Sequence, residues 1–326
     1  MPMINLITKP IIKPKRLKPG DTIAIVSPSS GIWERRELSQ SIEALESMGY
    51  HVKLGDHALK RHYYLAGSDE QRAEDLMWAF SDDTVDAIFA SQGGYGAARL
   101  LKHLDFDRIH QNPMIFMGYS DITSLHLAIA KETGLVTFHG PSALSFGSEA
   151  MTPYRMTGIQ KAIMLSTPIG VIKRGSLPKA IVKLNGGTAE GALIGGNLSL
   201  VCATLGTPWE IDTRGKVLFL EDIEVEPWQM DHLLTHMMNA GKFENAAAIV
   251  IGECKACEPF EHRPGFPNQC SLENLIYEFF EGLEKPVLYG FPIGHTKDLA
   301  TLPMGVRARV NADDGVFEVI EAGVCD

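Results

Sequence analysis

The first half of the chain alternates strand-like apolar runs with amphipathic helical patterns, and no other feature limits the fold so strongly. A helix after the first strand carries Leu38, Ile42, Leu45 and Met48 on one face, and Ser68 with Gln71 forms a capping box that opens another helix. Such alternation predicts a parallel sheet with helices on both faces. The predicted strands are residues 22–26, 51–54, 85–90, 114–118 and 136–138.

The loops that follow these strands are rich in serine, glycine and histidine. In open parallel sheets, ligands bind beyond the carboxyl ends of the strands. We therefore expect the loops at residues 27–30, 93–96, 120 and 139–141 to converge on one rim of the sheet.

The pattern changes after about residue 150, and the 326 residues favour two domains. We predict an N-terminal α/β domain at residues 1–150, a linker at 151–184 and a second α/β domain with a compact, barrel-like sheet at 185–326. In this second half, strands are expected at 190–194, 217–220, 246–251 and 316–320, and helices after Asn197, at 227–238 and at 271–281.

Ser120 lies on a strand-to-helix turn, in the motif Gly118-Tyr-Ser-Asp121. The first N–H groups of a helix favour negative charge, so such a turn suits both a nucleophile and an oxyanion. The residues of the turn leave a second interpretation open, in which Ser120 only caps the helix.

A serine nucleophile needs a base, and the base needs a group that orients it. Glu221 ends an apolar strand, and His295 follows the Gly/Pro-rich turn at residues 290–294. Each has an ordinary alternative, because Glu221 could stabilise a helix terminus and most of the eleven histidines need no catalytic role. Of the other histidines, His139 stays a weaker candidate, and three within helical patterns are assigned structural roles: His126, His232 and His236.

The segment Gly93-Gly-Tyr-Gly96 lacks the lysine of a phosphate-binding P-loop, so nucleotide binding is poorly supported. Glycines let backbone N–H groups approach a substrate oxygen closely. We assign the N–H groups of Gly94 and Asp121 to an oxyanion hole.

Composition narrows the possible partners. The net charge of −10 argues against nucleic acid or an anionic membrane, and no window approaches the length of a membrane span. The N-terminus lacks the apolar core of a secretory signal, which predicts a cytoplasmic protein.

Part of a zinc-binding pattern occurs in the second half of the chain, at Cys254 and Cys257, with His262 and Cys270 nearby. The second ligand motif that would complete a zinc site is missing, so reduced thiols are expected instead.

Ten ordered motifs together resemble the LD-carboxypeptidase family, serine peptidases that trim murein peptides, which include a microcin-immunity branch. The resemblance covers nearly the whole chain. The motifs are Lys18-Pro-Gly-Asp-Thr22, Ala66-Gly-Ser-Asp-Glu70, Gly93-Gly-Tyr-Gly96, Gly118-Tyr-Ser-Asp121, Phe138-His-Gly-Pro141, Gly195-Gly-Asn-Leu198, Gly206-Thr-Pro-Trp209, Leu220-Glu-Asp222, Gly294-His295 and Thr301-Leu-Pro303.

The resemblance implies a flavodoxin- or Rossmann-like N-terminal domain, a swivelling-barrel-like C-terminal domain, and a homodimer. It implies that Ser120 is the nucleophile, His295 the base and Glu221 the residue that orients the base. Many relatives carry arginine where this chain has Gln92, a departure that concerns substrate preference. Four residues in or beside the shared motifs are assigned to substrate binding: Gln92, Tyr95, Asn197 and Trp209.

The implied reaction is hydrolysis of the L,D-amide bond to the terminal D-alanine of a murein tetrapeptide, without metal or organic cofactor. Three alternatives remain. The microcin-immunity branch would cleave a peptidyl-nucleotide instead. An α/β-hydrolase esterase shares the order Ser, Glu, His, but Ile122 occupies the second glycine position of its GxSxG motif. A two-domain small-molecule binding protein would show the same alternation of strands and helices without a reactive serine.

Overall fold

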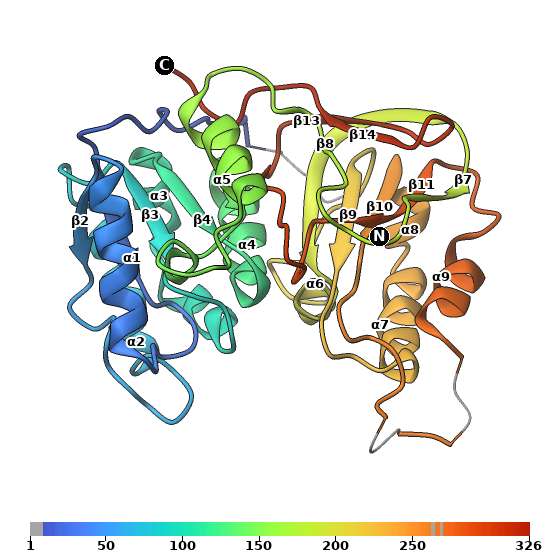
Figure 1. Ribbon diagram of the computed structural model, residues 1–326, viewed down its shortest axis with the longest axis horizontal. Coiled ribbons are helices and arrows are strands. Elements are labelled where there is room, and N and C mark those ends of the chain that lie inside the picture. Colours follow the sequence, from blue (N-terminus) through green and yellow to red (C-terminus); the bar gives the residue numbers. More distant parts are fainter. Residues whose placement is uncertain (1–8, 262–264, 268–269) are drawn as a thin grey trace, which may run out of the picture.

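The protein forms two lobes, each built on its own β-sheet (Figure 1). The structure is a computed structural model that describes residues 9–261, 265–267 and 270–326. The first sheet has six strands in the order β12-β5-β4-β3-β1-β2, in which β1 to β5 are parallel and β12 is antiparallel to β5. Its strands are β1 (Thr22–Val26), β2 (His51–Leu54), β3 (Ala87–Ala90), β4 (Ile115–Gly118), β5 (Phe138–His139) and β12 (Leu302–Pro303).

Alternate side chains of the first sheet pack against two different sets of helices. On β1, Ile23 and Ile25 join the core that contains residues of α1 and α5, whereas Ala24 and Val26 join the core that contains residues of α2, α3 and α4. Both faces of the sheet are therefore covered, and the predicted α/β fold is confirmed (Figure 1). These helices are α1 (Arg35–Ser47), α2 (Asp69–Ala79), α3 (Phe106–Gln111), α4 (Thr123–Thr133) and α5 (Pro153–Ile159).

Local sequence signals explain where several elements begin. Ser68 and Gln71 form the predicted capping box at the start of α2. Asn197 caps α6 through its side chain, and Pro227 occupies the first turn of α7, as predicted.

The second lobe contains an eight-stranded mixed sheet in the order β6-β14-β13-β8-β9-β10-β11-β7. Strands β8 to β11 are parallel to their neighbours in that run, while β7, β13 and β14 pair antiparallel. The strands are β6 (Gly170–Val171), β7 (Val182–Asn185), β8 (Thr188–Asn197), β9 (Val217–Glu221), β10 (Ala248–Gly252), β11 (Val287–Phe291), β13 (Arg307–Asn311) and β14 (Val316–Val319). The helices are α6 (Leu198–Thr204), α7 (Pro227–Asn239), α8 (Lys242–Asn245) and α9 (Leu272–Phe280).

The sequence-based description missed four strands of this lobe, β6, β7, β11 and β13. Residues 151–184, predicted as a linker, contain α5, a π-helical segment at Gln160–Met164, β6 and the start of β7. The domain boundaries at 150 and 184 stay a prediction.

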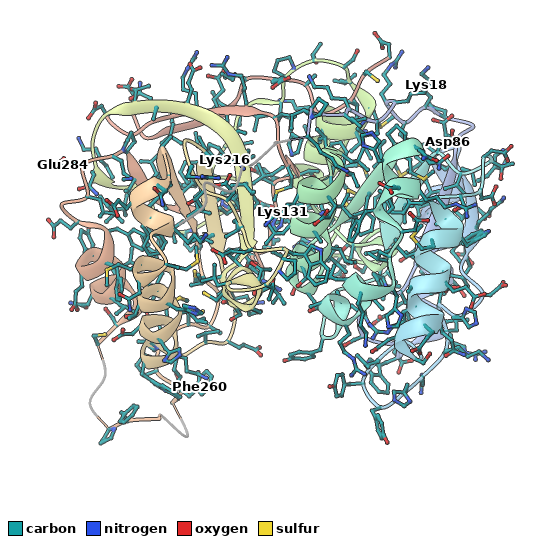
Figure 2. All side chains as sticks on the ribbon, turned by 180° about the vertical axis from the view of Figure 1, so that it is seen from behind. Lys18, Asp86, Lys131, Lys216, Phe260 and Glu284 are labelled. Atoms are coloured by element: carbon teal, nitrogen blue, oxygen red, sulfur yellow. The ribbon has the colours of Figure 1, made fainter. Side chains whose placement is uncertain are left out.

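The lobes contact each other at several points. Strand β12, far along the chain, pairs with β5 of the first sheet. Lys131 of α4, labelled near the middle of Figure 2, donates to the carbonyl of Glu210 at 3.1 Å. The backbone N–H of Asn197 donates to Thr123 Oγ1 at 3.1 Å, which joins α4 to the end of β8. In the part of the chain that the structure describes, no helix is both long enough and apolar enough to cross a membrane.

Candidate active site

Ser120 is the first residue of a short 3₁₀ turn, Ser120–Ile122, between the end of β4 and the start of α4. Its φ of +65° lies in the left-handed region, which side chains other than glycine rarely adopt. Backbone strain of this kind persists where the surrounding structure enforces it, often at functional sites. Ile122, not Ser120, occupies the N-cap position of α4, so the helix-capping interpretation of Ser120 is wrong.

The three predicted triad residues form a continuous chain of hydrogen bonds between the two lobes. His295 Nε2 lies 3.0 Å from Ser120 Oγ, and His295 Nδ1 lies 2.8 Å from Glu221 Oε2. Both distances are within hydrogen-bond reach for a nucleophile, a base and an orienting carboxylate. Ser120 comes from the first lobe, whereas Glu221 ends β9 of the second lobe and His295 follows β11.

The Glu221 carboxylate is completely buried, and both of its oxygens have partners. Oε2 faces His295, and Oε1 accepts from Asn197 Nδ2 at 3.3 Å. Gly294 allows this approach, because a Cβ at that position would lie 2.2 Å from Glu221 Oε2. A buried carboxylate without partners would be strongly unfavourable, so this environment fixes Glu221 in one orientation.

Asn197 holds two adjacent carboxylates together. Besides Glu221, its Nδ2 donates to Asp222 Oδ1 at 2.9 Å, and the other Asp222 oxygen accepts from the backbone and hydroxyl of Ser199. Burial, and then the neighbouring charge of Glu221, raises the pKa of Asp222. The sequence analysis included Asp222 in the motif Leu220-Glu-Asp222 but assigned it no role, and it did not predict this bridge.

The glycine loop lies directly against the nucleophile. A Cβ on Gly93 would lie 2.9 Å from Ser120 Cβ, and a Cβ on Gly94 would lie 2.2 Å from Ser30 Oγ. Gly94 also adopts a φ of +115°, and its N–H donates to no acceptor among the described residues. It is therefore free to bind a substrate oxygen, as the oxyanion assignment requires.

Asp121, the second oxyanion candidate, has a buried side chain that supports the same loop. Its carboxylate accepts from Ser29 Oγ and from the Ala97 N–H at 2.8 Å. Burial raises the pKa of this carboxyl group. The roles of the Gly94 and Asp121 amides stay predictions.

A cavity of about 490 Å³ opens beside Ser120 and His295. Residues of the predicted loops at 27–30, 93–96 and 120 line it, which confirms that these three loops converge on one rim. None of residues 139–141, the fourth predicted loop, is among the described lining residues. Among described residues, the lining comprises Ser30, Trp33, Glu37, Gln92, Gly93, Gly94, Tyr119, Ser120, Ser142, Leu144, Ser145, Ser148 and His295.

Of the four residues assigned to substrate binding, only Gln92 lines this cavity. Its Nε2 donates to the Gly31 carbonyl at 2.7 Å. Tyr95 is exposed, with its ring centroid 6.0 Å from that of Tyr64. Asn197 is buried beneath Glu221, and Trp209 packs against the first-lobe core, so neither side chain faces the cavity in the described structure.

Two buried histidines form hydrogen bonds with backbone segments next to the site. His139 Nε2 donates to the Ile293 carbonyl, 2.8 Å away, which links β5 to the segment that carries His295. Burial lowers the pKa of His139, which favours the neutral form of its ring. His126 bonds the Gly118 carbonyl at the end of β4, and burial lowers its pKa to about 3.

Cys254 and Cys257 are buried free thiols. Among the described residues, no group of three or more histidine, cysteine and acidic side chains is arranged to hold a metal ion. His262, the third member of the zinc pattern, lies outside the described residues, as do residues 1–8 of the N-terminus.

Comparisons with known proteins agree with the motifs. Residues 23–140 match the family model of the LD-carboxypeptidase N-terminal domain, and residues 190–310 match that of the LD-carboxypeptidase C-terminal domain. A probable murein peptide carboxypeptidase of Bacillus subtilis is 40% identical over 96% of this chain and 96% of its own length. The murein tetrapeptide carboxypeptidase of Pseudomonas aeruginosa is 31% identical over 88% of this chain and 92% of its own.

A solved structure supports the fold assignment. The crystal structure of an MccF-like protein from Bacillus anthracis is 29% identical to this chain and superimposes with a TM-score of 0.84. The match covers 95% of this chain and 99% of that protein.

Proposed function

Because the chain belongs to the LD-carboxypeptidase family and is a carboxypeptidase, we propose that it removes the terminal D-alanine of murein tetrapeptides. The proposed catalytic groups are Ser120, His295 and Glu221. The hydrogen-bonded chain through these three residues at the cavity carries the proposal. The relatives named for murein peptides support the choice of substrate.

The proposed reaction begins with attack of Ser120 Oγ on the carbonyl carbon of the amide bond to D-alanine. His295 Nε2 accepts the hydroxyl proton, while Glu221 holds the Nδ1–H and stabilises the imidazolium. The tetrahedral oxyanion lies on the N–H groups of Gly94 and Asp121. His295 then protonates the departing amino group of D-alanine.

Water completes the reaction. His295 removes a proton from a water molecule, which attacks the ester carbonyl of the acylated Ser120 and releases the shortened peptide. These steps are carried out by side-chain and backbone groups of the two lobes. Because the nucleophile and the base come from different lobes, correct docking of the lobes is a condition of activity.

Mass spectrometry of a murein tetrapeptide incubated with the purified protein tests the proposal. We expect the wild-type protein to convert the tetrapeptide to a tripeptide and free D-alanine, and the Ser120→Ala variant to leave it intact. Ser124→Ala is a matched control, because Ser124 is a buried serine in α4 that does not line the cavity. An intact tetrapeptide after incubation with wild-type protein would overturn the proposed substrate.

Cleavage of a peptidyl-nucleotide is the second candidate function. The similarity to the MccF-like protein and the exposed Trp33 ring in the cavity favour it, because an aromatic ring can stack on a nucleobase. Incubation with a peptidyl-nucleotide in the same assay distinguishes the two substrates. The cytoplasmic location, the homodimer and the place of this reaction in peptidoglycan recycling stay predictions.

A further inference from the structure

One buried cation, which does not line the catalytic cavity, has no part in the proposed reaction. Arg155 lies in α5, which packs on the first sheet (Figure 1), and is only 5% exposed. Its Nε donates to the Lys297 carbonyl at 2.9 Å, and its Nη2 donates to the Thr296 carbonyl at 2.8 Å. Thr296 and Lys297 directly follow His295. The guanidinium group therefore binds the backbone of the turn that carries the proposed base.

Arg155 has no carboxylate within ion-pair distance in the part of the chain that the structure describes. The buried Arg72 differs, because it forms an ion pair with Asp69 at 2.6 Å. Burying a cation without a counter-ion is unfavourable. Fold stability alone is therefore a poor reason for an arginine at position 155.

Two further side chains of the first lobe bind the same turn, residues 293–298. His139 of β5 donates to the Ile293 carbonyl, on the other side of the base. Thr152, the N-cap of α5, donates to Asp298 Oδ1 at 2.7 Å. The base follows a strand of the second lobe, yet the backbone on both sides of it is bound to the lobe that carries the nucleophile.

This arrangement fixes the distance between the base and the nucleophile. The hydrogen bond to Glu221 orients the His295 ring, but Nε2 must also stay within reach of Ser120 Oγ, which lies 3.0 Å away. A displacement of about 1 Å can reduce the rate of such a reaction roughly 100-fold. Because Arg155 and Ser120 belong to the same lobe, the bonds from α5 keep the turn after His295 in place relative to the nucleophile.

We propose that Arg155 is a positioning residue for the general base, and that it holds His295 within hydrogen-bond distance of Ser120 by binding the two carbonyls that follow the base. This inference rests on the proposed function, because it assumes the catalytic roles of His295 and Ser120. Arg155 itself acts only through the backbone of the turn. An arginine suits this task, because its planar group presents several donors in a fixed geometry and can bind two adjacent carbonyls at once.

A purely structural role for Arg155 makes a different prediction. If this arginine only joined α5 to a distant segment, its loss would lower the free energy of unfolding, while the molecules that remain folded would react at the wild-type rate. Loss of a positioning residue instead slows the reaction of folded molecules. It should lower kcat with little change in KM, because the contacts with substrate stay in place.

The test measures the rate at which a fluorophosphonate labels Ser120 in the wild-type protein, in Arg155→Met and in Arg155→Lys. This reagent requires an activated serine but no peptide substrate. We expect labelling to slow about 100-fold in Arg155→Met, as for a displacement of about 1 Å. In Arg155→Lys, which keeps the charge but lacks the planar group, labelling should slow about tenfold. For both variants, kcat for D-alanine release should fall by the same factor, with little change in KM.

Lys285→Met is the matched control. Lys285 is also a cation bound to backbone carbonyls, those of Phe243, Glu244 and Ala246 at the end of α8, and it does not line the cavity. Its loss should lower the free energy of unfolding and leave the labelling rate unchanged. Equal slowing of labelling in Lys285→Met and Arg155→Met would overturn the positioning role.

The remaining outcomes separate the positioning role from the proposed function. A wild-type protein that is not labelled at Ser120 would overturn the serine mechanism and the positioning role with it. Equal labelling rates in wild type and a folded Arg155→Met would overturn the positioning role alone. Labelling of Ser120 without release of D-alanine would overturn only the proposed substrate. If circular dichroism shows that Arg155→Met does not fold, Arg155→Lys decides, and a wild-type labelling rate in that variant would overturn the positioning role.

Discussion

The two lobes contribute to the site in opposite ways. The first lobe supplies Ser120, partly exposed in a strained turn and flanked by glycines that leave room for a substrate. The second lobe supplies Glu221, completely buried with both oxygens bonded. A nucleophile must be reached by substrate, whereas the group that orients the base must not move. In the proposed mechanism, the first lobe therefore provides access and the second lobe rigidity, and His295 links the two groups by hydrogen bonds.

The largest effect should follow from loss of the Glu221 charge. Glu221→Gln keeps the shape of the side chain but cannot stabilise the imidazolium, and it can reverse the tautomer of His295. We expect kcat for D-alanine release to fall about 10⁴-fold, as for comparable triads. Circular dichroism would establish that the variant is folded, and a fall of less than tenfold would contradict the orienting role.

Glycine-to-alanine substitutions compare how well each lobe accommodates an added Cβ next to the proposed catalytic groups. Gly294→Ala would place a Cβ 2.2 Å from the fixed Glu221 carboxylate, and Gly93→Ala would place one 2.9 Å from Ser120 Cβ. We expect kcat to fall about 100-fold for Gly294→Ala and less for Gly93→Ala, because the buried carboxylate has nowhere to move. Gly158→Ala is the control, since its nearest neighbour would lie 3.5 Å away. Equal losses of kcat in Gly294→Ala and Gly93→Ala would contradict the proposal that the surroundings of Glu221 are more rigid than those of Ser120.

Acid should destabilise the first lobe through His126. Burial lowers the pKa of His126 in the folded state to about 3, whereas histidine in the unfolded state has a pKa near 6.5. Below pH 6.5 the unfolded state therefore binds more protons than the folded state. Its contribution to stability is present above pH 6.5 and is lost as the pH falls toward 3. At pH 5 the loss is about 2 kcal/mol.

Denaturant unfolding at pH 7 and pH 5 measures this loss. The His126→Gln variant, though less stable overall, should lose about 2 kcal/mol less than wild type between these two pH values. The control variant His51→Gln replaces an exposed histidine and should behave like wild type. The same pH dependence in His126→Gln and wild type would show that this histidine is not the cause.

The smallest expected effect concerns Asn197. Because its amide holds Glu221 and Asp222 and does not face the cavity, Asn197→Ala should lower kcat about tenfold with little change in KM. Steady-state kinetics with the tetrapeptide measures both constants. A raised KM with unchanged kcat would instead support the direct contact with substrate that the sequence motif predicted.

Regular patterns made much of the fold predictable. The alternation in the first half and the capping box at Ser68 and Gln71 identify β1, β2, α2 and the parallel sheet. The missed strands lack such patterns. Strand β11 contains Gly290 and precedes a proline, and β13 alternates arginines with small apolar residues. The return of Leu302–Pro303 to the first sheet involves two residues and depends on tertiary contacts alone.

The candidate site was predictable where a residue type and a turn coincide. Ser120 lies in a strand-to-helix turn, Glu221 ends an apolar strand, and His295 follows a Gly/Pro-rich turn. The motifs that contain them resemble a known family. The Asn197 bridge and the Glu37 carboxylate were not predictable, because each depends on which distant segment packs opposite. Glu37 belongs to a charged run that is typical of a solvent-exposed helix face, and only the folded chain places it at the cavity.

Covalent labelling of Ser120 by a fluorophosphonate tests the central claim most directly, because this reagent reports activation of a serine without any choice of peptide substrate. We predict that intact-mass and peptide analysis will find one label on wild-type protein, at Ser120, and strongly reduced labelling of His295→Ala and Glu221→Gln. Labelling of these variants at the wild-type rate would show that the second lobe does not activate the nucleophile. Labelling at another residue would show that Ser120 is not the nucleophile.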